Sequence, residues 1–311
     1  MGEFELIRRF FDRGPSRRCA LGIGDDCAVL HAAVPGTTLA VATDMLVAGR
    51  HFLADADPAG IGHKALAVNL SDLAAMGAQP RAFTLALALP EPDPAWLEAF
   101  AGGLFALADR FDCELIGGDT TRGPLNICVT VLGELPVGAA LRRDRAEPGD
   151  DLWVSGALGG AALALRLGEQ AAPLERQRLD RPEPRVALGL ALRHLARSAI
   201  DVSDGLIGDL GHVCDRSRVG AEVDWPAVPL SPGLQSEEGA LHPALALGGG
   251  DDYELLFSAA PENRRSIEAL GTRLGLPLAR IGRIVAGQGV RLLDARGRPM
   301  RIDFHSHDHF A

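Results

Sequence analysis

The sequence contains a single lysine, Lys64, among its 31 basic residues. Lys64 stands in Gly62-His63-Lys64-Ala65, which matches neither the phosphate-binding loop of P-loop proteins nor the strand lysine of protein kinases. These two common classes of nucleotide kinase are therefore excluded. The sequence also lacks His-Glu-x-x-His and Gly-x-Ser-x-Gly, so it indicates neither a zinc protease nor a serine hydrolase.

Long apolar runs and long basic runs are missing as well. The longest apolar stretch, Ala82 to Leu89, has the length of a buried strand and not of a membrane span. The 31 Lys+Arg against 41 Asp+Glu give a net charge of -10, which disfavours nucleic acid and anionic membranes as partners. The five cysteines lack Cys-x-x-Cys spacing, and the N-terminus lacks an apolar leader. We therefore expect reduced thiols, no structural zinc and a cytoplasmic protein.

The length of 311 residues is enough for two domains, each with its own core. Residues 136–140 are the best candidate for a boundary, so we expect domains at 1–140 and 141–311. Apolar periodicity predicts strands at 38–42, 81–89, 114–116, 126–135, 151–154 and 198–202, and helices at 58–76, 94–111, 161–167 and 185–197. Both halves mix helices and strands without one long alternating series, which favours an α+β fold over a Rossmann fold.

Aspartates beside glycines or at the ends of predicted strands carry the chemistry of this sequence. They are Asp25, Asp26, Asp44, Asp72, Asp119, Asp201, Asp204, Asp251 and Asp252. A single Gly-Asp pair is most often an exposed turn, but Asp72 lies in an apolar helix and Asp201 ends an apolar strand. A buried carboxylate needs a partner or a metal, and carboxylate oxygens suit Mg²⁺. We therefore expect a shared Mg²⁺ site that admits a phosphate-bearing substrate.

A glycine-rich turn at residues 155–160 follows a predicted strand and opens a predicted helix. A phosphate could bind at such a helix N-terminus, and a tight structural turn explains the glycines equally well. The sequence leaves both interpretations open.

Taken together, these segments resemble the thiamine-phosphate kinase family of the aminoimidazole ribonucleotide synthetase-like superfamily. The resemblance is carried along nearly the whole chain by GEF (2–4), GIGDDCA (22–28), ATD (42–44), KALAVNLSDLAAMG (64–77), GGDTTRGP (117–124), DVSDGL (201–206), DYEL (252–255) and DHF (308–310). It implies mixed sheets with helices packed on them, a homodimer that pairs through its N-terminal sheets, and an active site in a cleft between the domains. The N-terminal domain would bind metal and ATP and form the dimer, and the C-terminal domain would complete the cleft. The implied reaction transfers the γ-phosphoryl group of ATP to thiamine phosphate with several Mg²⁺ ions, giving thiamine diphosphate and ADP.

The same resemblance implies roles for individual residues. By motif match, the metal ligands would be Asp26, Ala42 (through its carbonyl), Thr43, Asp44, Asp72, Asp119, Asp201 and Asp204. The ATP contacts would be Gly118, Asp119, Arg143 and Ser203, and the thiamine phosphate contacts would be His51, Asp251 and His307. No acid-base residue is assigned, because the nucleophile is an already ionised phosphate oxygen and an in-line transfer needs positioning and charge neutralisation.

Three positions depart from the family pattern. Ala42 stands where the family often has serine, Asp251 where it commonly has glutamate, and His307 where it commonly has an aromatic residue. These changes affect the substrate contacts more than the metal ligands. Two other interpretations remain open: another ATP-dependent synthetase of the same superfamily, and a catalytically silent nucleotide-binding scaffold.

Overall fold

The computed structural model describes residues 3–14, 16–21, 23, 29–31, 34–53, 55–236 and 241–301. The chain divides into two compact units. Unit 1 comprises Met1–Leu73 and Ala78–Gly138, and unit 2 comprises Ala74–Gly77 and Ala139–Ala311. None of the helices in the described ranges combines the length and apolar character that a membrane span requires.

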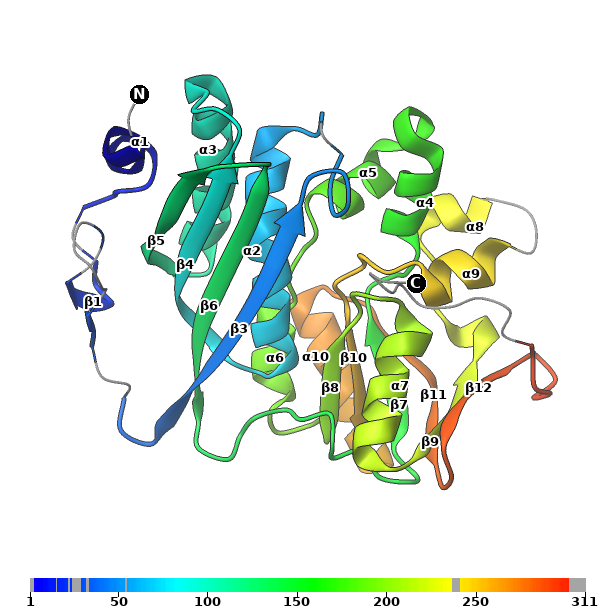
Figure 1. Cartoon of the computed structure of the whole chain (residues 1–311). Helices are drawn as coiled ribbons and strands as arrows, with labels where there is room; N and C mark the ends of the chain where they lie inside the picture. Colours follow the sequence, from blue (N-terminus) through cyan, green and yellow to red (C-terminus); the bar gives the residue numbers. More distant parts are fainter. Residues whose placement is uncertain are drawn as a thin grey trace. The chain divides into compact units, whose positions relative to one another are not determined.

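Unit 1 is built around a four-stranded sheet with the order β3-β6-β4-β5 (Figure 1). Its elements are α1 (Glu3–Phe10), β1 (Cys19–Leu21), β2 (Val29–Leu30), β3 (Thr37–Val47), α2 (Pro58–Ala75, whose last two residues belong to unit 2), β4 (Gln79–Leu89), α3 (Pro94–Arg110), β5 (Glu114–Arg122) and β6 (Asn126–Pro136). The predicted helices at 58–76 and 94–111 are confirmed. The predicted strands at 38–42 and 114–116 are too short, because both strands continue through the polar and glycine residues that follow.

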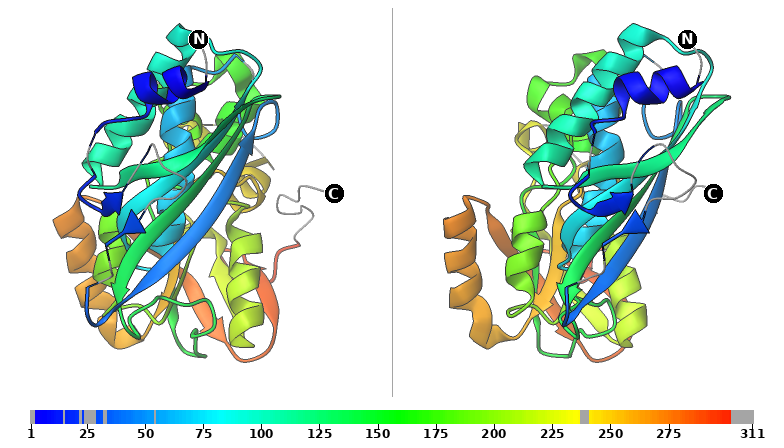
Figure 2. Two further views of the ribbon diagram at one scale, coloured as in Figure 1. Left: turned by 60° about the vertical axis from the view of Figure 1, so that its left-hand side comes forward. Right: turned by 90° about the vertical axis from the view of Figure 1, so that its left-hand side faces the viewer.

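Helices α2 and α3 both cover one face of this sheet (Figure 2). The first turn of α3 is capped by Asp93, whose carboxylate accepts a hydrogen bond from the amide of Ala95 at 2.9 Å. Glycine allows the two helices to approach closely, because a Cβ on Gly103 would lie 1.9 Å from the carbonyl oxygen of Ala59. The opposite face of the sheet carries the exposed side chains of Leu39, Val41 and Met45 on β3.

Unit 2 contains a six-stranded mixed sheet with the order β12-β9-β11-β7-β10-β8. Its elements are β7 (Asp151–Ser155), α4 (Gly160–Leu167), α5 (Pro173–Asp180), α6 (Val186–Leu192), β8 (Ser198–Asp201), α7 (Leu206–Ser217), β9 (Gly220–Asp224), α8 (Pro232–Ser236), α9 (Leu241–Gly248), β10 (Leu255–Ala259), α10 (Arg264–Leu274), β11 (Leu278–Val285) and β12 (Gly289–Leu293). Helix α7 packs on one face of the sheet, and α6 and α10 lie on the other (Figure 2). The helix predicted at 185–197 ends early, at Leu192, where the amides of Leu195 and Ala196 both bond to the Leu192 carbonyl.

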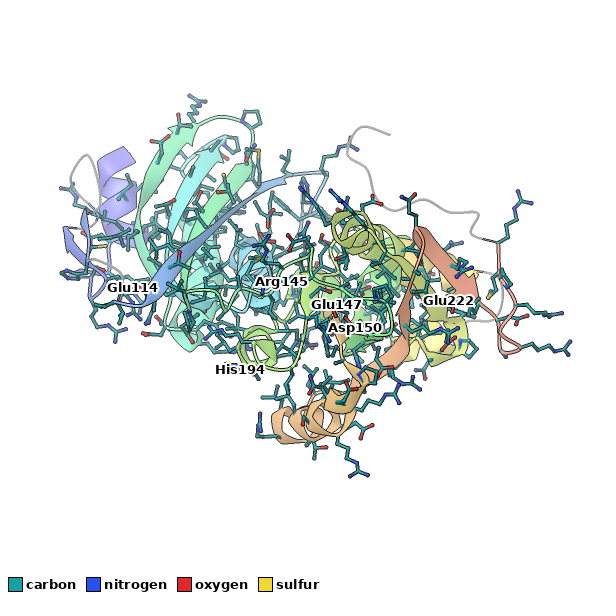
Figure 3. The ribbon with its side chains drawn as sticks, turned by 90° about the horizontal axis from the view of Figure 1, so that it is seen from below. Glu114, Arg145, Glu147, Asp150, His194 and Glu222 are labelled. Atoms are coloured by element: carbon teal, nitrogen blue, oxygen red, sulfur yellow. The ribbon has the colours of Figure 1, made fainter. Side chains whose placement is uncertain are left out.

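Two carboxylates on the sheet of unit 2 are each held by two arginines. Asp151 accepts bonds from Arg264 (2.5 and 2.7 Å) and Arg280 (3.3 Å). Burial alone would raise the pKa of Asp151, but the hydrogen bonds and charges of these arginines outweigh it and lower the pKa. Glu222, labelled in Figure 3, is bound in the same way by Arg283 and Arg291, at 2.6 and 2.9 Å.

Candidate functional site

In unit 2, strand β8 brings three of the predicted residues to one loop. Asp201 is the last residue of β8 and is buried, which confirms that it ends a strand entering the core. Ser203 and Asp204 follow in the loop before α7 begins. Gly205 has a φ of 108°, and a Cβ there would lie 2.7 Å from the Cα of Gly248. The loop therefore requires glycine at the point where it turns into the helix.

The segment from Gly250 to Tyr253 packs against this loop and brings Asp251 to it. The amide of Asp251 donates to the carbonyl of Ser203 at 2.8 Å, and the amide of Tyr253 donates to the carbonyl of Val202 at 2.8 Å. Asp251 and Tyr253 have φ values of 61° and 50°, which non-glycine residues rarely adopt. Such strained residues cluster at functional sites.

The side chain of Asp251 is oriented by the only tyrosine of the chain. The hydroxyl of Tyr253 donates to Oδ1 of Asp251 at 3.0 Å, and Tyr253 itself is buried. The structure thus brings Asp251 to Ser203 and Asp204, which belong to a different segment of the sequence, the DVSDGL motif.

A carboxylate that the sequence analysis missed lies beneath the same loop. Asp209 on α7 is 2% exposed, and its Oδ2 accepts hydrogen bonds from the amides of Ser203 (3.0 Å) and Asp204 (3.1 Å). Burial raises the pKa of Asp209 to about 8, and the charges of Asp201 and Asp204 contribute to the increase. Asp201 and Asp204 therefore lie close to a third carboxyl group, and clustered carboxyl groups favour a divalent cation. In the sequence, Asp209 looks like any polar residue of a helical first turn.

The glycine-rich turn at 155–160 is held by two acidic side chains of the chain itself. Both carboxylate oxygens of Asp252 lie 3.0 Å from the amide of Gly159, just before α4. Glu254 accepts from the Ser155 hydroxyl and from Arg185, and a Cβ on Gly156 would lie 1.9 Å from its Oε1. Of the two interpretations left open by the sequence, this geometry favours the structural turn.

In unit 1, Thr43 and Asp44 lie inside β3, so the prediction that Asp44 follows a strand is wrong. The Thr43 hydroxyl lies 2.9 Å from the Thr130 hydroxyl of β6. The Asp44 amide donates to Oδ1 of Asn69 on α2 at 3.0 Å. Asn69 is fully buried and is three residues from Asp72, so both side chains lie on the same side of α2. Asp72 is half-buried, less than the sequence suggested.

Asp119 lies inside β5, and the sheet register places it on the opposite face from Asp44. Asp119 stands opposite Ala86, Ala86 opposite Cys128, and Cys128 opposite Met45. Directly opposed residues share a face and consecutive residues alternate, so Asp119 is on the face of Met45 and Asp44 is on the other. The residue before Asp119 must be glycine, because a Cβ on Gly118 would lie 1.9 Å from the carbonyl oxygen of Leu85.

His51 lies in the turn after β3 and is held at two points. Its Nδ1 accepts a hydrogen bond from the Val47 amide at 3.0 Å, which leaves Nε2 as the protonated nitrogen of the neutral ring. Its carbonyl accepts from Nζ of Lys64 at 3.2 Å, and Lys64 is 3% exposed. The single lysine of the chain therefore anchors the turn that carries His51.

The remaining predicted residues are less informative. Arg143 is exposed in the segment before β7, and its carbonyl accepts from the Ser217 hydroxyl at 2.7 Å. Ala42 is on β3, two residues before Asp44. Asp26 and His307 lie outside the described residues.

The donor set fits Mg²⁺ by its chemistry, because the predicted side chains are carboxylates and a hydroxyl. Among the residues that the structure describes, no three His, Cys, Asp or Glu side chains lie close enough to hold a metal ion. The metal ligands therefore stay a prediction.

Unit 1 also has a cavity of about 250 Å³, away from the predicted residues. Its lining includes Phe11, Phe105, Cys113, Arg13 and Asp109, and the last two are joined by a hydrogen bond of 2.6 Å. Burial raises the pKa of Cys113 to about 12, so this thiol is not a reactive nucleophile.

The whole chain matches known proteins. Residues 24–135 match the N-terminal domain of AIR synthase related proteins, and residues 147–295 match their C-terminal domain. The thiamine-monophosphate kinase of Escherichia coli K12 is 48% identical over 325 residues, which cover 100% of this chain and 98% of the relative. The crystal structure of the thiamine-monophosphate kinase of Stenotrophomonas maltophilia K279a has a TM-score of 0.85 at 51% identity, covering 93% of this chain and 94% of the other. The structure of AaThiL complexed with AMPPCP and TMP has a TM-score of 0.79 at 32% identity, covering 90% and 89%.

Proposed function

The chain belongs to the thiamine-monophosphate kinase family, and we infer that it transfers the γ-phosphoryl group of ATP to thiamine phosphate, giving thiamine diphosphate and ADP. The observation that carries this inference is the similarity along the full chain, at 48% identity to a curated thiamine-monophosphate kinase. A structural relative was solved with AMPPCP and TMP, the kind of pair that the reaction uses.

We propose that several Mg²⁺ ions take part and that carboxylates of each unit bind them. In unit 2 these are Asp201 and Asp204, and the support is that the buried Asp209 side chain holds the Asp204 amide in the loop that directly follows Asp201. In unit 1 they are Asp44, Asp72 and Asp119, with Thr43 and the Ala42 carbonyl, and Asp26 completes the set. When bound, Mg²⁺ supplies charge neutralisation for the phosphates, which an acidic site could not otherwise admit.

The other predicted residues bind and orient the two substrates. We propose that Gly118, Asp119, Arg143 and Ser203 contact ATP. His51, Asp251 and His307 are proposed to contact thiamine phosphate. For Asp251 the support is the orientation of its side chain, because the hydroxyl of Tyr253 donates to one of its carboxylate oxygens. For Arg143 the support is that its side chain is exposed while its backbone is held, because the Ser217 hydroxyl donates to the Arg143 carbonyl.

We also propose that the protein is a homodimer paired through the sheets of unit 1. The support is the exposed apolar row of Leu39 (49%), Val41 (61%) and Met45 (54%) on one face of β3. A cytoplasmic location is proposed because the four cysteines in the described ranges, Cys19, Cys113, Cys128 and Cys214, are free thiols.

The test is ³¹P NMR of the purified protein with ATP, Mg²⁺ and thiamine phosphate, repeated with a chelator. The expected result is joint appearance of thiamine diphosphate and ADP, only with metal. Formation of ADP and inorganic phosphate without thiamine diphosphate would indicate that the protein uses ATP but acts on another substrate of the superfamily. No reaction under any condition would favour a silent scaffold.

A further inference from the structure

Asp209 holds the backbone of the loop that carries Ser203 and Asp204. A single oxygen of its side chain, Oδ2, accepts from both amides, at 3.0 and 3.1 Å. In an extended strand consecutive amides point to opposite sides, so this pair of bonds shows that the chain turns directly after β8.

The helix itself does not supply a cap for this turn. Residue Gly205 precedes α7 and has no side chain that could bond to the first amides of the helix. Asp209 reaches back from inside α7 instead, in the manner of the glutamate in a capping box, but to the two residues before Gly205.

The opposite side of the loop is held by carbonyl groups. Ser203 accepts from the amide of Asp251, and Val202 accepts from the amide of Tyr253, both at 2.8 Å. Asp209 thus binds amides of the loop, and the Gly250–Tyr253 segment binds its carbonyls. The cost is a carboxylate buried to 2% exposure close to two other aspartates.

We propose that Asp209 is a positioning residue for phosphoryl transfer, which fixes the loop so that Ser203 faces ATP and Asp204 faces Mg²⁺. The proposal rests on the proposed function for the roles of Ser203 and Asp204. It assigns Asp209 no contact with substrate or metal. The working part is the oxygen atom and its position, so an uncharged acceptor of the same shape suffices.

The test compares Asp209→Ala, Asp209→Asn and the matched control Asp215→Ala, an exposed aspartate on the same helix. The Ala variant removes the acceptor, and we expect kcat/KM for ATP to fall about tenfold or more, with a higher Mg²⁺ concentration for half-maximal rate. The Asn variant keeps an oxygen for both amides and is expected to stay within about threefold of the parent protein. Asp215→Ala is expected to behave as the parent protein.

Equal losses in the Ala and Asn variants, with both folded, would overturn the proposal, because the negative charge would then be the working part. Full activity of the Ala variant would also overturn it. If the Ala variant does not fold, the Asn variant decides alone.

Amide hydrogen exchange at Ser203 and Asp204 provides a readout that needs no turnover. Slow exchange is expected in the parent protein and in the Asn variant, and fast exchange in the Ala variant. Fast exchange in the parent protein would contradict the proposal even where the kinase reaction is observed. Absence of the kinase reaction with slow exchange would instead contradict the proposed function.

Discussion

In unit 2, Ser203, Asp204 and Asp251 are joined by hydrogen bonds of the chain itself, whereas in unit 1 Asp44 and Asp119 lie on opposite faces of one sheet. The unit 2 loop is fixed on its amide side by Asp209 and on its carbonyl side by a segment with strained φ values. The unit 1 residues are instead placed by regular strand and helix geometry. One part of the proposed machinery is therefore a preformed loop, and the other depends on sheet register.

The largest expected effect comes from removing one carboxylate charge in either unit. Asp72→Asn in unit 1 and Asp204→Asn in unit 2 are each expected to lower kcat by roughly a hundredfold or more, because Mg²⁺ loses a charged ligand. Steady-state rates at saturating Mg²⁺ provide the measurement. Asp180→Asn, which removes only a surface ion pair with Arg176, is the control. Near-normal rates in both test variants would contradict the assignment of Asp72 and Asp204 as metal ligands.

A second prediction concerns the dependence of the stability of unit 1 on its sheet register. Gly118→Ala places a Cβ 1.9 Å from a strand carbonyl, and we expect a loss of about 3 kcal/mol in stability or failure to fold. Gly117→Ala is the matched control, since a Cβ there has no atom within 4 Å. Thermal or urea unfolding of the two variants is the measurement. Equal stabilities would mean that β5 does not require a glycine before Asp119.

A smaller effect is expected from one hydroxyl in unit 2. Tyr253→Phe removes the bond that orients Asp251 and should raise KM for thiamine phosphate about fivefold, in line with one lost hydrogen bond. KM for ATP is expected to stay unchanged, because the loop of Ser203 keeps its backbone bonds. A change in both KM values, or in neither, would contradict the assignment of Asp251 to the thiamine phosphate site.

The smallest effect concerns the sheet of unit 2 and depends on pH. Asp151→Asn is expected to lower Tm by a few degrees at pH 7, because two arginines lose their anionic partner. The pKa of Asp151 is lowered in the folded protein, so its contribution is present above the unfolded pKa of about 3.9 and is lost as pH falls through the folded pKa. The difference in Tm should therefore shrink below about pH 4. Glu222→Gln, at the other two-arginine site, is the comparison. A difference in Tm that stays constant with pH would contradict the role of the charge.

Much of the fold follows from the sequence, and so does the family. The helix at 58–76 is predicted because its apolar residues surround it, and α2 is buried on nearly all sides. The extent of β5 is not predictable, because Gly117 and Gly118 are typical of a loop. The strand continues there because it pairs with β4, and Gly118 leaves room for the carbonyl of Leu85. The sequence therefore predicts Asp119 beyond the strand at 114–116, and the structure places it inside β5.

The same reasoning explains what was missed in unit 2. The motif of Asp201 and Asp204 is visible in the sequence, but the role of Asp209 depends on two amides of the preceding loop, which no periodicity indicates. The approach of Asp251 to Ser203 joins residues far apart in the sequence through positive φ values, which favour glycine and are not expected for aspartate or tyrosine.

The most direct test of the account is a double-mutant cycle on kcat/KM with Asp72→Asn, Asp204→Asn and the combined variant. If carboxylates of both units serve one metal-dependent phosphoryl transfer, the losses are not independent, and the combined loss is well below the product of the single losses. That is the predicted result. A combined loss equal to the product would mean that the two aspartates act independently, and it would contradict the shared role assigned to the two units.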